Sequence, residues 1–110
     1  MKDKLCLITG GGSGIGRATA IKFAENKVDT IIVGRREEAL AETKNLANTN
    51  SKYINYIKAD ISSYEGINNL YNEIDEKFDN YVNILVNNAG SSSQIRSVAH
   101  IPKEQWDEVL

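Results

Sequence analysis

A cluster of glycines between an apolar run and a helical segment is the feature that most restricts the fold of this chain. Five glycines fall within residues 10–16, directly after the apolar run Lys4–Thr9. A plain turn needs one or two glycines, so this number indicates backbone at positive φ or in close approach to another group. A strand that turns directly into a helix also leaves unpaired N–H groups at the positive end of the helix, which favours a phosphate there. The sequence therefore predicts a strand–turn–helix unit with an anion site.

Short apolar runs alternate with helical segments along the rest of the chain. Lys4–Thr9, Thr30–Val33 and Ile84–Val86 are almost entirely apolar, while Tyr53–Ala59 is more mixed. Runs without polar alternation are typical of strands that are covered on both faces, as in parallel sheets. The order βαβαβαβα predicts a single α/β unit, a doubly wound parallel sheet with right-handed crossovers.

The spacing of apolar residues predicts the buried face of each helix. The inward candidates are Ile15, Ala18, Ile21 and Ala24 in the first helix, Ala39, Leu40, Ala41, Leu46 and Ala47 in the second (Glu37–Ala47), and Ile67, Leu70, Ile74 and Phe78 in the third. Ser62 and Glu65 form a predicted capping box before the third helix, and Asn26 is the expected left-handed cap of the first. Pro102 is expected to open a fourth helix that reaches Leu110.

Composition excludes several classes of protein. The 110 residues include 13 Lys and Arg against 15 Asp and Glu, so no basic surplus points to nucleic acid or an anionic membrane. One Cys and one His provide neither a disulfide nor a metal quartet, and Cys6 is expected to be a small buried hydrophobe in a reducing compartment. The N-terminal apolar run is too short for a signal peptide or a membrane span, which predicts a cytoplasmic protein.

The spacing of the glycines distinguishes between phosphate-binding motifs. The fingerprint G-x-G-x-x-G fails, because counting from Gly10 and Gly12 the last glycine would fall on Ile15. The nucleoside-triphosphate loop also fails, because Gly16 is followed by Arg-Ala rather than by Lys and Ser or Thr. The pattern T-G-x-x-x-G-x-G does fit, with Thr9 at its first position.

At this point the sequence resembles the classical short-chain dehydrogenase/reductase family. Three further motifs lie in order along the chain: Asp60-Ile61, Asn87-Asn88-Ala89-Gly90 and Trp106. The resemblance spans essentially the whole chain and implies a Rossmann-like fold that binds a nicotinamide dinucleotide. It implies that the pyrophosphate and the adenosine ribose lie against Gly10, Gly12, Ser13, Gly14, Ile15 and Gly16.

The end of the second strand bears on the choice of cofactor. An acidic residue there would accept hydrogen bonds from the ribose 2′-OH and repel a 2′-phosphate. This chain has Gly34 at that position, followed by Arg35 and Arg36, which predicts NADP(H) rather than NAD(H). Two observations leave NAD open: Glu37 and Glu38 could neutralise the arginines, and Ser13 stands where NADP-binding relatives often have a basic residue.

The remaining motifs have both a binding and a structural interpretation. By resemblance, Asp60 would accept the adenine amino group with Ile61 packed nearby, although Asp60 could equally cap the next helix. Asn88, Ala89 and Gly90 would line the adenosine site. Asn87 is expected to be structural, because an amide after a buried strand needs partners.

The family's chemistry requires a Tyr-x-x-x-Lys pair, a Ser and an Asn. The residues four positions after the five tyrosines are Ile57, Asp60, Asn68, Asp75 and Leu85. We therefore expect residues 1–110 to be the N-terminal NAD(P)-binding part of such an enzyme, truncated after about four strands and inactive alone. The fourth strand is then expected to be an exposed sheet edge through which the chain self-associates, while the parent enzyme is expected to be a homo-oligomer.

Two other classes of function are compatible with part of this pattern. A non-catalytic nucleotide-binding or interaction module would keep the glycine loop without the chemistry. A methyltransferase also uses a glycine-rich first loop, but it would require an acidic residue near Arg35 for its cofactor ribose. The substrate cannot be identified from these residues, because the family shapes its substrate site mainly with the C-terminal half.

Overall fold

Four parallel strands form the centre of the structure. The computed structural model describes residues 4–78, 82–88 and 94–97. The strands are β1 (Leu5–Thr9), β2 (Asp29–Gly34), β3 (Ile54–Lys58), β4 (Ile84–Asn87) and β5 (Gln94–Ser97). The helices are α1 (Gly14–Glu25), α2 (Glu37–Leu46) and α3 (Tyr64–Phe78), with a 3₁₀ helix η1 (Asn48–Tyr53) between α2 and β3.

The sheet has the strand order β3-β2-β1-β4-β5. β1 pairs in parallel with both β2 and β4, and β2 pairs in parallel with β3. The chain thus first extends the sheet in one direction from β1 and then returns to add β4 on the other side. This reversal is the defining feature of a doubly wound Rossmann-like sheet, and the predicted fold class is confirmed.

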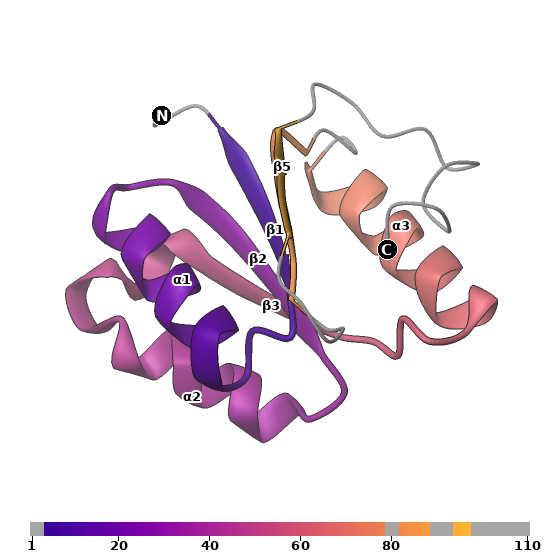
Figure 1. Cartoon of the computed structure of the whole chain (residues 1–110), viewed down its shortest axis with the longest axis horizontal. Helices are drawn as coiled ribbons and strands as arrows, with labels where there is room; N and C mark the ends of the chain where they lie inside the picture. Colours follow the sequence, from indigo (N-terminus) through magenta and orange to yellow (C-terminus); the bar gives the residue numbers. More distant parts are fainter. Residues whose placement is uncertain (1–3, 79–81, 89–93, 98–110) are drawn as a thin grey trace.

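Helices cover both faces of the sheet (Figure 1). α1 and α2 lie on one face and α3 lies on the other. Each face has its own apolar core: Leu7, Ile31 and Val33 pack with α3, whereas the alternate strand residues Ile8 and Ile32 pack with α1 and α2. Since successive residues of a strand point to opposite faces, a strand between two helical layers is apolar at most of its positions.

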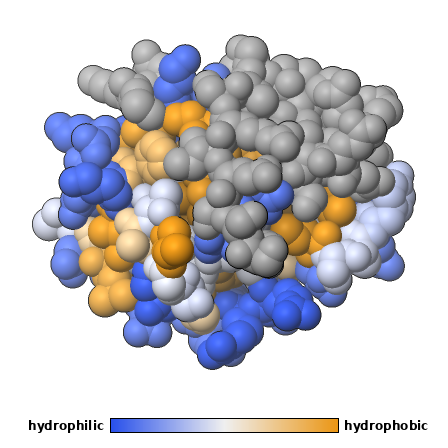
Figure 2. Space-filling view, in the orientation of Figure 1, coloured by the Kyte–Doolittle hydropathy of each residue, from blue (hydrophilic) through white to orange (hydrophobic). Residues whose placement is uncertain are grey.

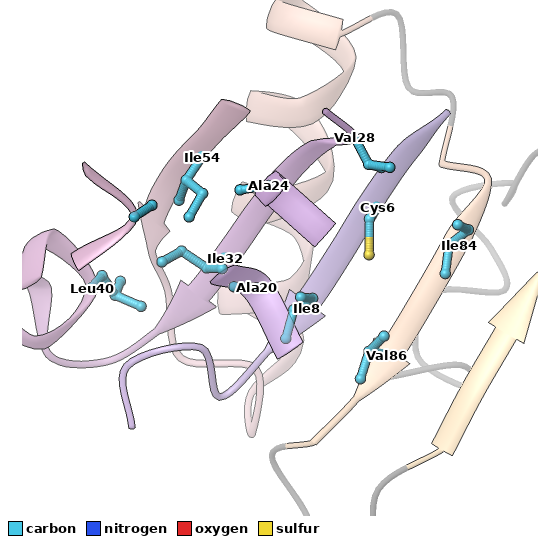
Figure 3. Close-up of a cluster of buried hydrophobic side chains, with 11 residues drawn as sticks. Cys6, Ile8, Ala20, Ala24, Val28, Ile32, Leu40, Ile54, Ile84 and Val86 are labelled. Atoms are coloured by element: carbon cyan, nitrogen blue, oxygen red, sulfur yellow. The ribbon is translucent and has the colours of Figure 1, made fainter. Parts of the chain in front are cut away.

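The core on the α1 side is built around small helical residues (Figure 3). Ala20 and Ala24 face the sheet, and Gly16 completes the buried positions of α1. The predicted inward face is therefore wrong except at Ala24, because Ile15 is 66% exposed, Ala18 is exposed and Ile21 is half-buried. The three buried residues recur every four positions and have little or no side chain, which lets the helix axis lie close to the strands.

The predicted faces of α2 and α3 are closer to the structure. Leu40 and Ala47 are buried as expected, but Leu46 is 47% exposed and the polar Thr43 is fully buried instead. The outward face of α2 is charged, and Figure 2 shows hydrophilic residues along the lower rim where Figure 1 places this helix. In α3, the predicted Ile67, Leu70 and Ile74 are all buried, while the side chain of Phe78 lies outside the described residues.

Two predicted helix caps are wrong by one residue. α3 begins at Tyr64, and Ser63 rather than Ser62 caps it, since the Ser63 hydroxyl accepts a hydrogen bond from the Gly66 N–H at 3.0 Å. At the end of α1, Lys27 rather than Asn26 adopts the left-handed conformation, with φ of 62°. The Lys27 N–H donates to the Ala24 carbonyl and the Val28 N–H to the Phe23 carbonyl, which is the Schellman pattern of helix termination.

β5 overturns the expectation of an unpaired edge at β4. It pairs with β4 in antiparallel register, so the far side of β4 is hydrogen-bonded. The expectation of self-association through that edge loses its physical basis, because the N–H and C=O groups that would recruit another strand are already paired. The sequence QIRS has one strongly apolar residue and no alternation, so periodicity could not reveal this strand. The predicted helix after Pro102 lies outside the described residues.

No helix in the described ranges is long and apolar enough to cross a membrane.

Cys6 gives a test of the packing on the α1 side. Burial in β1 raises the pKa of its thiol to about 12, so the native state holds the thiol neutral. The unfolded state ionises nearer the ordinary pKa, so this contribution to stability is complete at neutral pH and is lost between about pH 9 and pH 12. We expect Cys6 at pH 8 to react with a disulfide reagent at least about 100-fold more slowly in the native protein than in denaturant.

The pH dependence of this effect separates the thiol from other groups. The free energy of unfolding of the wild type should fall relative to that of Cys6→Ala as the pH rises above about 9. A constant difference between the two proteins across that range would show that the native thiol ionises normally.

Candidate functional site

The segments singled out by their motifs meet at one edge of the sheet. The register aligns Thr9 at the end of β1 with Val33 of β2 on one side and Asn87 of β4 on the other. Gly34 of β2 lies opposite Lys58 of β3. Parallel strands have their carboxyl ends on the same side, so the four following loops converge there. In open α/β sheets, ligands bind outside this edge where the strand order reverses, which here is between β1 and β4.

The glycine loop leaves β1 through two left-handed residues. Gly10 has φ of 70° and Gly14 has φ of 58°, values that other residue types adopt only at a cost. The Gly10 N–H donates to the Val33 carbonyl at 2.8 Å, which ties the start of the loop to the end of β2. Between Gly10 and Gly14 the chain forms a turn, and α1 begins at Gly14.

Two further glycines permit close contacts. A Cβ on Gly16 would collide with the Gly10 carbonyl oxygen, and a Cβ on Gly11 would lie 2.5 Å from the Ile32 Cβ. By contrast, a Cβ on Gly14 would meet nothing within 4 Å among the described atoms. The loop is thus tightly packed on its inner side and open on its outer side at Gly14 and the neighbouring Ile15.

The first turn of α1 is open to an anion. Ser13 is the N-cap residue, yet within the described part of the chain its side chain makes no capping hydrogen bond. The first N–H groups of a helix have no partner inside the helix, and the helix dipole adds partial positive charge at this end. No acidic residue lies in the first turn of α1 to compete with a bound anion. This geometry suits a phosphate group.

Arg17 connects the loop to α2, a role that sequence analysis missed. Its guanidinium donates to the carbonyl oxygens of Gly12 (2.6 Å) and Ala39 (3.1 Å) and to the hydroxyl of Thr43 (2.9 Å). Glu42 of α2 lies 3.6 Å from it in an ion pair. One sequence signal was present, since a cation near the positive end of a helix is unfavourable without compensating partners.

Asn87 and Asn88 attach the end of β4 to the end of β1. The Thr9 hydroxyl donates to Asn87 Oδ1 at 3.1 Å and accepts from the Asn88 N–H at 2.9 Å. The Asn88 side-chain amide donates to the Gly10 carbonyl at 3.4 Å. Asn87 thus has the structural partner that was expected for it, and Asn88 lies directly beside the glycine loop. Ala89, Gly90 and Trp106 lie outside the described residues.

Arg35 and Arg36 follow β2 as exposed residues. In the described part of the chain, neither of them forms an ion pair with Glu37 or Glu38, the pairing that the alternative interpretation of these arginines requires. Arg36 is the N-cap residue of α2. Gly34 presents no charge at the end of β2, and a Cβ placed there would lie 3.3 Å from Leu40 Cδ2.

Asp60 organises the turn after β3. Its Oδ1 atom accepts hydrogen bonds from the Ser62 hydroxyl (2.6 Å) and the Ser62 N–H (3.0 Å). These two hydrogen bonds, with the positive charge of Arg35, lower the pKa of the Asp60 carboxyl below its ordinary value. Asp60 is therefore not the helix cap, since Ser63 has that role. Ile61 is partly buried against the α3 core.

Arg35 and Asp60 share an open groove. The groove has a volume of about 480 Å³ and lies between the end of β3 and α3 as far as Glu73. The groove has cations (Arg35, Lys58) and carboxylates (Asp60, Glu65, Glu73) on one concave surface, which offers partners for both the phosphate and the amino group of an adenosine phosphate.

Comparison with known proteins agrees with this geometry. Residues 4–110 match the short chain dehydrogenase family model. The chain is 32% identical over its whole length to an uncharacterized oxidoreductase of Thermotoga maritima, of which it covers 42%. Among solved structures, 81% of the chain resembles glucose dehydrogenase of Caenorhabditis elegans in its apo form (TM-score 0.71, 37% identity, 38% of that chain). In a second comparison, 84% of the chain resembles the RhlG/NADP active-site complex of Pseudomonas aeruginosa (TM-score 0.72, 35% identity, 36% of that chain).

The chain belongs to the short-chain dehydrogenase family, an oxidoreductase family whose members bind nicotinamide dinucleotides. It spans about two fifths of the length of the relatives that it matches.

The packing of the loop gives a testable order of stabilities. Gly16→Ala forces a methyl group against the Gly10 carbonyl, so we expect it to lower the free energy of unfolding by about 2–3 kcal/mol. In Gly14→Ala the new methyl group meets no described atom, so only the positive φ should destabilise the protein and the free energy of unfolding should fall by about 1 kcal/mol. Urea denaturation of the two variants measures both values. Equal losses in the two variants would contradict the close contact at Gly16.

Proposed function

We propose that this chain is the nucleotide-binding part of an NADP(H)-dependent oxidoreductase that transfers hydride between the cofactor and a carbonyl or alcohol. The observation that best supports the proposal is the open first turn of α1 at the switch point of the sheet, with a tightly packed glycine loop behind it. The free space at Gly14 is where a pyrophosphate can approach the backbone. When bound, the nicotinamide ring of the cofactor supplies or accepts the hydride.

Each segment has a proposed role in holding the cofactor. The pyrophosphate and the adenosine ribose lie against Gly10, Gly12, Ser13, Gly14, Ile15 and Gly16. Arg35 and Arg36 bind the 2′-phosphate, and the ionised Asp60 accepts the adenine amino group beside Ile61. Asn88, Ala89 and Gly90 line the adenosine side.

The preference for NADP(H) rests on the charges at the end of β2. Arg35 and Arg36 are exposed, and no carboxylate within the described residues is in ion-pair contact with them. A forked guanidinium binds a phosphate well, whereas the acidic residue that would bind a 2′-OH is replaced by Gly34. The structural relative bound to NADP agrees with this choice. The domain assignment of residues 1–110, a cytoplasmic location and a homo-oligomeric parent enzyme are parts of the same proposal.

Dissociation constants for NADPH and NADH test the cofactor preference. We expect NADPH to bind more tightly, and Arg35→Gln to weaken NADPH binding about ten- to hundredfold while leaving NADH binding unchanged. Lys22→Gln, which removes an exposed cation of α1, is the matched control and should change neither constant. Tighter binding of NADH by the wild type would overturn the preference, and binding of neither nucleotide would overturn the proposed function.

Gly34→Asp provides the converse test. A carboxylate at the end of β2 should repel the 2′-phosphate and accept hydrogen bonds from a 2′-OH, so the preference should shift toward NADH by at least about tenfold. The new Cβ presses on Leu40, so Gly34→Ala serves as the control that adds the same Cβ and no charge. If Gly34→Ala shifts the ratio of the two constants as far as Gly34→Asp does, the charge is not the cause.

A further inference from the structure

Two successive carbonyl groups of the glycine loop accept hydrogen bonds from side chains at the contact between α1 and α2. The Thr43 hydroxyl donates to the Gly11 carbonyl at 2.8 Å, and Arg17 donates to the Gly12 carbonyl at 2.6 Å. Thr43 is fully buried, and the Arg17 side chain is 24% exposed. Both carbonyls are thereby held on the side of the loop that faces α2.

Fixing these carbonyls also fixes two amide groups. A trans peptide is planar, and its N–H points in the opposite direction to its C=O. The Gly12 N–H belongs to the same peptide as the Gly11 carbonyl, and the Ser13 N–H to the same peptide as the Gly12 carbonyl. Because Thr43 of α2 holds the Gly11 carbonyl and Arg17 of α1 holds the Gly12 carbonyl, both N–H groups must point away from α2, toward the outer side of the loop.

The partners of Arg17 keep it in this position despite the helix dipole. Its Nε donates to Thr43 and its Nη2 donates to both Gly12 and Ala39, so the planar fork joins three groups at once. The ion pair with Glu42 offsets its charge near the positive end of α1. Since the guanidinium is directed at α2 rather than at the open side of the loop, it acts through the loop.

We propose that Arg17 is a positioning residue: together with Thr43 it sets the peptide planes of the glycine loop so that the amides face the pyrophosphate. The inference rests on the proposed nucleotide-binding function and deepens it. Arg17 should therefore affect binding of the pyrophosphate, which NADPH and NADH share. It should not affect binding of the 2′-phosphate, which only NADPH has. α2 therefore supports the inner side of the glycine loop, and its N-terminus directly follows Arg35 and Arg36 in the sequence.

The test compares Arg17→Met with Arg17→Lys, Thr43→Val and the control Lys22→Met. Lys22 lies on the same helix, and its removal changes the charge equally without contacting the loop. Dissociation constants are measured for NADPH, for NADH and for adenosine 2′-monophosphate, which has the 2′-phosphate but no pyrophosphate. Amide hydrogen exchange of residues 10–16 is followed without any nucleotide.

We expect Arg17→Met to weaken the binding of NADPH and of NADH by the same factor, about tenfold or more. The dissociation constant of adenosine 2′-monophosphate should not change. Exchange of the loop amides should accelerate while exchange in β1 and β2 does not. Arg17→Lys should not rescue binding, because a single ammonium cannot replace the fork that joins three acceptors. Thr43→Val should show the same pattern with a smaller effect, and Lys22→Met should match the wild type.

Other outcomes would overturn the inference. A loss of NADPH and adenosine 2′-monophosphate binding without a loss of NADH binding would make Arg17 a ligand of the 2′-phosphate. Unchanged loop exchange in Arg17→Met would show that the loop keeps its conformation without the guanidinium. If the wild type binds neither dinucleotide, the proposed function fails, and the exchange measurement alone decides the role of Arg17. If Arg17→Met does not fold, the Lys and Val variants decide it by the same measurements.

Discussion

The absence of a side chain at Gly16 is the constraint on which the rest of the site depends. Because no Cβ stands between α1 and the Gly10 carbonyl, the helix begins directly against the end of β1. The small residues Ala20 and Ala24 continue this close contact along the sheet. The helix N-terminus is thereby held at the point where the strand order reverses, and its free N–H groups face the open edge of the sheet.

This arrangement divides the site into a rigid inner side and an open outer side. On the inner side, the loop is bound to β2 through Gly10, to β4 through Asn88 and to α2 through Arg17 and Thr43. The outer side offers backbone amides, the exposed Arg35 and the ionised Asp60. The proposed cofactor would need little rearrangement of such a site, since donors that are oriented in advance lower the cost of binding.

The spacing of apolar residues along the sequence predicted most of the strands and helices. Nearly continuous apolar runs predicted β1, β2 and β4, because strands between two helical layers are buried on both faces, and the more mixed run Tyr53–Ala59 predicted β3. The apolar spacing of α3 predicted Ile67, Leu70 and Ile74 in the core, as observed. The same rule was wrong for α1, since it counted large apolar residues, whereas the helix packs so closely that only Gly16, Ala20 and Ala24 fit. β5 was missed because a short polar strand on an edge has no periodic signal.

The sequence by itself determined the order of the elements, the glycine loop and the side chains available at each strand end. These follow from backbone freedom, periodicity and charge, which are properties of neighbouring residues. Only the tertiary structure decided that Arg17 and Thr43 hold the loop, that Ser63 caps α3 and that Arg35 forms no ion pair with Glu37 or Glu38 among the described residues. Those outcomes depend on which atoms meet when distant segments pack together, and spacing along the chain does not contain that information.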